Sequence, residues 1–104
     1  MTEQFRQGDV LLTRIEELPD GLHPAARAAG RIVLAEGEAT GHAHAVSDAG
    51  AELLEGWGTR VLRVVGEPAT LLHEEHNAIV LRPGLYLVTR QREYDPDASR
   101  TVAD

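Results

Sequence analysis

Apolar residues occur in short runs along the chain, and turn-forming residues separate these runs. Short apolar or alternating runs are typical of β-strands, whereas no stretch repeats apolar residues at the spacing of a long amphipathic helix. The pattern therefore predicts roughly six to eight short strands and almost no helix. We expect an all-β fold, either a small β-barrel or a β-sandwich.

The strand boundaries follow from the turn-forming residues between the apolar runs. In chain order, the predicted strand regions are 9–15, 31–40, 42–48, 51–68, 69–77 and 78–94. The sequence PAARAA (24–29) allows at most one short helical turn, because Pro24 suits the start of a helix and Gly30 its end. The helical content is therefore expected to be minimal.

The segment AIVLRPGLYLVTRQREY (78–94) has the clearest hairpin pattern. Pro83 and Gly84 suit the two central positions of a type II turn. Beyond that turn, strict alternation places one set of residues on the same face: Tyr86, Val88, Arg90, Arg92 and Tyr94. This face could bind an anion or the carboxylates of a partner, but we interpret it as a solvated outer face with cross-strand pairs.

The core must be built mainly from aliphatic side chains, because aromatic residues make up only 4% of the sequence. Trp57 lies between two glycines and could line a ligand pocket. We expect instead that it closes the open end of the core, as large aromatic side chains commonly fill such gaps. A chain of 104 residues supports one domain, which we place at 1–94, with 95–104 as a loose tail.

Composition excludes several classes of protein. The net charge of −7 leaves no surplus of positive charge for nucleic acid and disfavours adsorption to anionic membranes. The absence of Cys excludes disulfides, thiolate metal sites and Cys nucleophiles. The N-terminal sequence MTEQFRQGDVLL has no apolar run of signal-peptide length, and no stretch approaches the length of a membrane span. We therefore expect a cytoplasmic protein.

Four of the five histidines fall into two clusters, His42 and His44 in HAH and His73 and His76 in HEEH. Residues two apart on a strand point to the same side, so HAH can offer two imidazoles to one ion. His73 and His76 would share a face only on a helical turn. We favour one metal site over the alternative of solvated or hydrogen-bonded strand histidines, and we expect His23, alone in a loop, to be solvated.

Carboxylates lie near both histidine clusters in the sequence: Glu38, Asp48, Glu74 and Glu75. Two or three histidines with one carboxylate suit Zn, Fe, Mn, Ni or Cu, and we expect one such divalent ion. An open coordination position would let the metal act as a Lewis acid or activate water. Glu74 or Glu75 could then serve as a general base.

The two histidine clusters also carry a resemblance. The stretch GEATGHAHAVSD (37–48) resembles the first cupin motif, in which a Gly precedes an HxH pair and an acidic ligand follows, here Asp48 instead of the usual Glu. The stretch PATLLHEEHN (68–77) is similar to the second cupin motif, with Thr70 in place of its usual Gly. The resemblance implies a cupin-like barrel. The ligands that it implies are His42, His44, Asp48 and His73.

Two hypotheses of different class follow. The first is a small metal-binding β-barrel protein, with ligands among His42, His44, Asp48, His73 and His76, which would act as a metal-dependent enzyme on a small molecule if chemistry occurs. The second is a non-enzymatic binding or accessory domain whose surface His/Glu cluster forms a contact site. In both, a homodimer is expected, because exposed strand edges are usually covered. The sequence QGD (7–9) is interpreted as a turn without a function.

Overall fold

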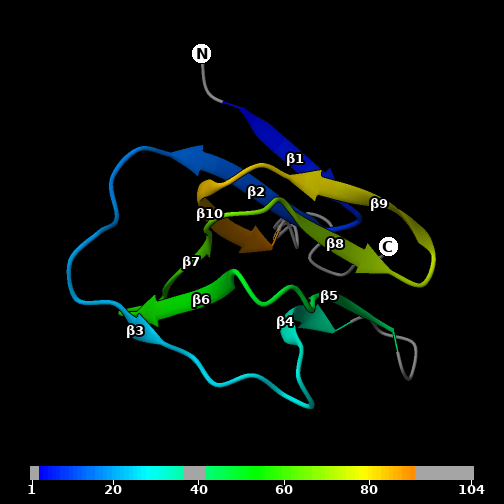
Figure 1. Ribbon diagram of the computed structural model, residues 1–104, viewed down its shortest axis with the longest axis horizontal. Coiled ribbons are helices and arrows are strands. Elements are labelled where there is room, and N and C mark those ends of the chain that lie inside the picture. The colour runs from blue at the N-terminus through cyan, green and yellow to red at the C-terminus, as the bar shows by residue number, and fades with distance from the viewer. Residues whose placement is uncertain (1–2, 37–41, 91–104) are drawn as a thin grey trace, which may run out of the picture.

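The computed structural model describes residues 3–36 and 42–90 of the chain (Figure 1). Within these ranges the chain forms ten strands and no helix, which confirms the prediction of an all-β fold. The strands are β1 (Gln4–Gln7), β2 (Val10–Ile15), β3 (His23–Pro24), β4 (Ile32–Glu36), β5 (Ala43–Val46), β6 (Ala51–Gly56), β7 (Thr59–Val64), β8 (Ala69–His73), β9 (His76–Leu81) and β10 (Gly84–Arg90).

The strands form two antiparallel sheets. The larger sheet has the order β1-β2-β10-β7-β6-β3, and the smaller sheet has the order β4-β5-β8-β9. Each backbone ladder ends at the edges of its own sheet in the described residues, so the two sheets do not join into one closed barrel. The described residues thus form a two-sheet β structure, and Figure 1 shows the smaller sheet beside the larger one.

Arginine side chains link the larger sheet to the edge of the smaller one. Arg60 of β7 donates to the carbonyl oxygen of Leu34 at 2.7 Å, and Arg90 of β10 donates to the carbonyl oxygen of Glu36 at 2.8 Å. Both carbonyls belong to β4, which is an edge strand. An unpaired strand edge invites pairing with another chain, so these guanidinium groups satisfy and block that edge.

The core lies between the sheets and is made of alternate residues from both. Its largest fully buried side chains include Tyr86, Leu12, Leu34, Leu62 and Leu71. The prediction that the Tyr86 face of β10 is solvated is therefore wrong: Tyr86 is fully buried and Val88 is 5% exposed, while Leu85 and Leu87 are half-buried on the other face. Arg92 and Tyr94, together with the predicted tail 95–104, lie outside the described residues.

A tight hairpin joins β6 to β7, where Gly56 pairs with Thr59 around the two residues Trp57 and Gly58. Both turn residues have positive φ, 52° at Trp57 and 78° at Gly58, as a type I′ turn requires. Trp57 is 92% exposed. The expectation that Trp57 closes the core is therefore wrong, because the turn holds the indole outside the packed layers.

The hairpin predicted at 78–94 does not form. β9 pairs with β8 in the smaller sheet, whereas β10 lies between β2 and β7 in the larger sheet. The chain crosses between the sheets at Arg82 and Pro83, and the carbonyls there accept hydrogen bonds from the Tyr86 hydroxyl at 2.6 Å and from Arg14 at 2.7 Å. In a hairpin these carbonyls would bond to the backbone of the partner strand, but here side chains donate to them.

The helical turn allowed at 24–29 does not form either. His23–Pro24 is strand β3, and Ala28 forms an antiparallel bridge with Arg31 around Ala29 and Gly30. The Arg27 guanidinium donates to four carbonyl oxygens, at distances of 2.6 to 3.3 Å, which belong to Gly30, Ser47, Asp48 and Ala51. This clamp fixes the segment against the β5–β6 turn and overrides its local helix propensity.

Candidate functional site

Four histidines from the two sequence clusters come together in the folded chain. The ring centroids of His44 and His73 are 4.3 Å apart, and those of His73 and His76 are 4.6 Å apart. The ring of His42 lies 5.7 Å from that of His73, and the ring of His44 lies 5.9 Å from that of His76. The structure therefore brings together the two clusters that the sequence analysis considered as one site.

Strand pairing explains this convergence. β5 and β8 are antiparallel neighbours with Ala45 opposite Leu72, so the next pair along the ladder is His44 and His73. His73 also pairs directly with His76 across the tight β8–β9 turn, after a register shift that follows Leu71. The shift lets His73 and His76 meet on one side, although a regular strand would separate them. His23 lies elsewhere, opposite Glu55 on β6.

The histidine cluster has a buried end and an exposed end. His44 is only 2% exposed, His42 and His73 are half-buried, and His76 is exposed. Burial, and then the charge of a protonated His73, lower the pKa of His44, whereas the nearby carboxylate of Asp9 acts in the opposite direction. The neutral imidazole of His44 is thus favoured, and this is the form that binds metal ions.

The turn between β1 and β2 supplies a carboxylate to this cluster. Oδ1 of Asp9 lies 3.5 Å from Nε2 of His44, and Oδ2 accepts a hydrogen bond from Nε of Arg90 at 2.9 Å. Burial raises the pKa of Asp9, but the hydrogen bond and charge of Arg90 outweigh this effect and leave the pKa below its ordinary value. Asp9 is therefore an anion beside the buried histidine.

The backbone at Gly8 closes one side of the cluster. A Cβ atom added there would lie 2.8 Å from Nε2 of His76 and 3.1 Å from Cε1 of His44. Gly8 has a φ of 60°, so the turn also places it in the left-handed region. In Figure 1 the β1–β2 turn and the β8–β9 turn lie at the same end of the molecule.

A buried glutamine contacts the other ring nitrogen of His44. Nδ1 of His44 lies 2.8 Å from Oε1 of Gln7, and Gln7 is 2% exposed. The amide nitrogen of Gln7 donates to the carbonyl oxygens of Leu71 at 3.1 Å and Asn77 at 2.9 Å. Gln7 thus connects β1 of the larger sheet to β8 and β9 of the smaller sheet.

The two predicted general bases differ in their surroundings. The Glu74 carboxylate accepts a hydrogen bond from the backbone N–H of Ala43 at 2.9 Å, and this bond is the main reason that its pKa lies below the ordinary value. Oε2 of Glu75 lies 3.6 Å from Nδ1 of His42, and the backbone N–H of Glu75 donates to Nδ1 of His73 at 3.0 Å. Glu75 is therefore the one whose carboxylate contacts a histidine of the cluster.

Asp48 has a structural contact at the opposite end of β5. Its Oδ1 accepts the backbone N–H of Thr70 at 3.0 Å, at the start of β8, whereas His44 and His73 face each other at the other end of these strands. Four residues of strand span about 13 Å, so this carboxylate is not brought beside His44. Of the acidic residues named from the sequence, Glu38 lies outside the described residues.

The histidines are close, but they do not form a finished coordination sphere. Within residues 3–36 and 42–90, no group of three or more His, Asp or Glu side chains is arranged so that it could hold a metal ion. The contacts of the ring nitrogens are consistent with this: Nδ1 of His44 faces Gln7, and Nδ1 of His73 accepts the Glu75 backbone N–H. A metal would require at least one ring to turn.

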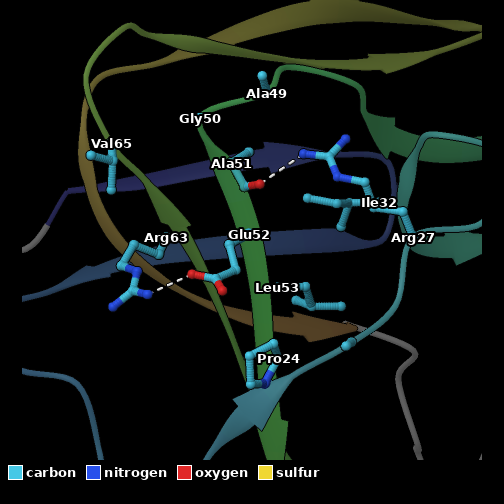
Figure 2. Close-up of a pocket in the computed structure, with 11 residues that line it drawn as sticks. Pro24, Arg27, Ile32, Ala49, Gly50, Ala51, Glu52, Leu53, Arg63 and Val65 are labelled. Atoms are coloured by element: carbon cyan, nitrogen blue, oxygen red, sulfur yellow. Dashed lines mark hydrogen bonds and ion pairs between the residues drawn. The ribbon is translucent and has the colours of Figure 1, made fainter.

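A cavity of about 560 Å³ lies at the end of the molecule away from the histidine cluster, as the position of Ala49 and Gly50 beyond the end of β5 shows. Figure 2 shows Arg27 bonded to Ala51 and Arg63 paired with Glu52 at its walls. The Nη groups of Arg27 are already bonded to backbone carbonyls. None of the residues of the cluster lines this cavity.

Gln7 and Asp9 are the site residues that the sequence analysis missed. They belong to the QGD segment, for which the sequence predicts a turn without a function. The turn is present, since β1 ends at Gln7 and β2 begins at Val10. The signal was a pair of polar side chains flanking a Gly between two strands, but nothing local indicated which distant residues they would meet.

The fold and the cluster define a small all-β protein with a partly buried histidine–carboxylate site. The chain belongs to a family described as a domain of unknown function, DUF8820, whose model matches residues 6–91. That range contains every residue of the cluster. No curated protein and no solved structure matches the chain. The family description makes no connection to the cupin superfamily, so the cupin resemblance stays a prediction.

No helix in the part of the chain that the structure describes has the length and apolar character needed to cross a bilayer.

Proposed function

We propose that this protein binds one divalent transition metal ion at the histidine cluster, with His44, His73, His76 and Asp9 as the ligands and His42 at the rim. The observation that carries this proposal is the convergence of four imidazole rings, with a charged carboxylate 3.5 Å from Nε2 of the buried one. Histidines that were only solvated strand residues would have no physical reason to gather at one place, whereas ligands of one ion must do so.

The donor set limits the metal. Imidazole nitrogens with one carboxylate suit Zn, Fe, Mn, Ni or Cu, and the chain has no Cys to offer a thiolate. Asp9 replaces Asp48 in the ligand set first inferred from the sequence, because Asp48 holds the backbone of Thr70 instead. Two sheets that are linked by side chains are compatible with a cupin-like barrel in which the two sheets are not joined by backbone pairing. A cupin-like barrel therefore remains part of the proposal.

Metal binding requires the His73 ring to turn. At present its Nδ1 accepts the Glu75 backbone N–H, which leaves the proton of the neutral ring on Nε2. His73 is half-buried and His76 is exposed, so both can change rotamer without unpacking the core. His44 is the buried member of the set, so His44 and Asp9 would hold the ion from the protein side, and His73 and His76 would complete the ligand set.

His76 is exposed, so solvent has access to that side of the cluster and would reach a bound ion there. A metal with an open position would act as a Lewis acid or lower the pKa of its bound water. Glu75 is the better candidate for a general base, because the Glu74 carboxylate is already held by the Ala43 backbone. We therefore extend the proposal to a metal-dependent enzyme acting on a small molecule, with Glu75 as the proton acceptor.

The experiment is a metal titration of protein purified without a histidine tag. Zn, Mn, Fe, Ni and Cu are offered separately after chelator treatment, and bound metal is counted by mass spectrometry. We expect about one ion per chain. His44→Gln and His76→Gln should each lose it, while the matched control His23→Gln should keep it, because His23 lies on β3 away from the cluster. Equal loading of all four proteins would contradict the site.

A second candidate function rests on the outer side of the smaller sheet. Leu72 and Val80 are 51% and 62% exposed there, close in sequence to the exposed Glu74, Glu75 and His76 of the β8–β9 turn. This apolar surface, with the polar β8–β9 turn at its border, would form a homodimer contact. Sedimentation velocity of the metal-free protein over a range of concentrations tests it, since a monomer at every concentration removes this function.

A further inference from the structure

The hydrogen bonds of the Gln7 side chain fix the orientation of its amide group. Its two amide hydrogens have two acceptors within reach, the carbonyl oxygens of Leu71 and Asn77. Carbonyl oxygens cannot donate, so the amide nitrogen must be the atom that faces them. The amide oxygen is thereby turned toward Nδ1 of His44, 2.8 Å away.

This orientation determines the tautomer of His44. The Gln7 oxygen has no proton to give, so Nδ1 of His44 must be the donor. A neutral imidazole carries one proton, and therefore Nε2 of His44 presents its lone pair. That lone pair is on the side of Asp9, because Nε2 is the atom 3.5 Å from the Asp9 carboxylate.

We propose that Gln7 is the positioning residue of the metal site: it locks His44 in the Nδ1–H form and aims its Nε2 lone pair at the ion. The inference rests on the proposed metal-binding function. Ligand histidines usually donate their other N–H to a carboxylate or a carbonyl group, which fixes the ring and increases its basicity. Gln7 supplies that acceptor as a neutral, buried amide.

A structural role alone does not account for the geometry. The donors of Gln7 would link β1 to β8 and β9 without any contact to His44. Its remaining oxygen, however, lies 2.8 Å from Nδ1 of His44, which is the buried histidine of the cluster. The same side chain therefore ties the two sheets together and sets the chemistry of the deepest ligand.

The first measurement needs no variant. Long-range proton–nitrogen NMR spectra of the metal-free protein, labelled with ¹⁵N histidine, report which nitrogen of each neutral ring carries the proton. We expect His44 to be in the Nδ1–H form. Observation of the Nε2–H form would overturn the inference, whether or not the protein binds a metal.

The second measurement compares metal affinities of variants by competition titration. Gln7→Leu removes the acceptor and should weaken binding about 10- to 100-fold. The matched control is Asp48→Ala, which removes a side-chain bond from the opposite end of β5 and should leave affinity unchanged. Its thermal stability reports the cost of a purely structural loss.

The two proposals fail in different ways. A wild-type protein that binds no ion removes the metal-binding function and this inference with it. If Gln7→Leu binds the ion as tightly as the wild type does, only the role of Gln7 is refuted. If Gln7→Leu does not fold, the tautomer of His44 in the wild-type protein still decides the question.

Discussion

Oδ1 of Asp9 and Nε2 of His44 lie 3.5 Å apart, although Asp9 is in the β1–β2 turn of the larger sheet and His44 is on β5 of the smaller sheet. Arg90 holds the other carboxylate oxygen at 2.9 Å and also caps the carbonyl of Glu36 on β4. Asp9 is therefore an oriented anion rather than a freely rotating surface carboxylate. In a metal site this arrangement would present one oxygen toward the ion and leave the second oxygen to Arg90.

Replacement of Asp9 by Asn should weaken metal binding by roughly tenfold or more, because the amide keeps the size of the side chain but removes its charge. Isothermal titration with the ion that binds best measures the effect. Glu3→Gln is the matched control, since Glu3 also pairs with arginine but contacts Arg82 and Arg14 instead of the cluster. If Asp9→Asn binds as tightly as the wild type, Asp9 is not a ligand.

Substitution of Gly8 by Ala should disturb the site more than the fold. The left-handed backbone itself costs an alanine about 1–2 kcal/mol. At Gly8 the new methyl group would also lie 2.8 Å from Nε2 of His76, which must move away. We therefore expect a loss of metal affinity in addition to the loss of stability, measured by titration and by urea unfolding.

The matched control for Gly8 is Gly30→Ala. Gly30 has a φ of 80°, but an added Cβ there would meet nothing within 4 Å. This variant should show the backbone cost of about 1–2 kcal/mol and normal metal affinity. If both variants have the same affinity, Gly8 is only a turn residue and does not shape the cluster.

Trp57→Asn should make the protein more stable. Trp57 has a φ of 52° at the first position of a type I′ turn, where Asn followed by Gly is the preferred pair. Because the indole is 92% exposed, its removal uncovers little apolar surface. The expected gain in the free energy of unfolding is about 0.5–1 kcal/mol, from relief of the strained backbone.

The Trp57 experiment has a built-in comparison. Trp57→Ala removes the indole but keeps an unfavourable residue at positive φ, so it should be no more stable than the wild type. Both variants lack Trp fluorescence, because the chain has no other Trp. Urea unfolding of all three proteins is therefore followed by circular dichroism. A clear loss of stability in Trp57→Asn would show that the indole, which lies near Gly21, stabilises the fold.

The alternation of residues predicted the strands and part of the site. Residues 9–15 do contain a strand, β2, and the HAH sequence does place His42 and His44 on one side, toward the other histidines. Alternation cannot say which of two faces is buried, however. On β10 the face of Tyr86 and Val88 is the inner one, because these residues lie opposite the buried Leu62 of β7 and Leu12 of β2.

The features that local patterns could not predict depend on distant contacts. Pro83 and Gly84 have the composition of a hairpin turn, yet the chain changes sheets there, because the carbonyls of Arg82 and Pro83 are held by Tyr86 and Arg14. The meeting of Gln7 and Asp9 with His44 likewise depends on how the sheets pack. A turn sequence alone carries no information about the partner that lies across the sheet boundary.

Tyr86 should cause alkaline destabilisation. Its hydroxyl donates to the carbonyl oxygen of Arg82 at 2.6 Å and accepts from Arg14 at 2.9 Å. Burial raises the pKa of Tyr86 above its ordinary value, which outweighs the opposite effect of the nearby arginines. Because the folded pKa is above that of the unfolded chain, the stabilisation by Tyr86 is complete below about pH 10 and is lost as the pH rises above it.

The measurement is the urea midpoint of the wild type and of Tyr86→Phe as the pH is raised above about 10. The chain suits this test because it has no Lys and no Cys to titrate in the same range. At neutral pH, Tyr86→Phe should be less stable by about 1 kcal/mol, since two hydrogen bonds are lost in the variant. Above pH 10 the wild type should lose stability faster, so that the two curves approach each other. Curves that remain parallel would show that Tyr86 ionises as easily in the folded chain as in the unfolded one.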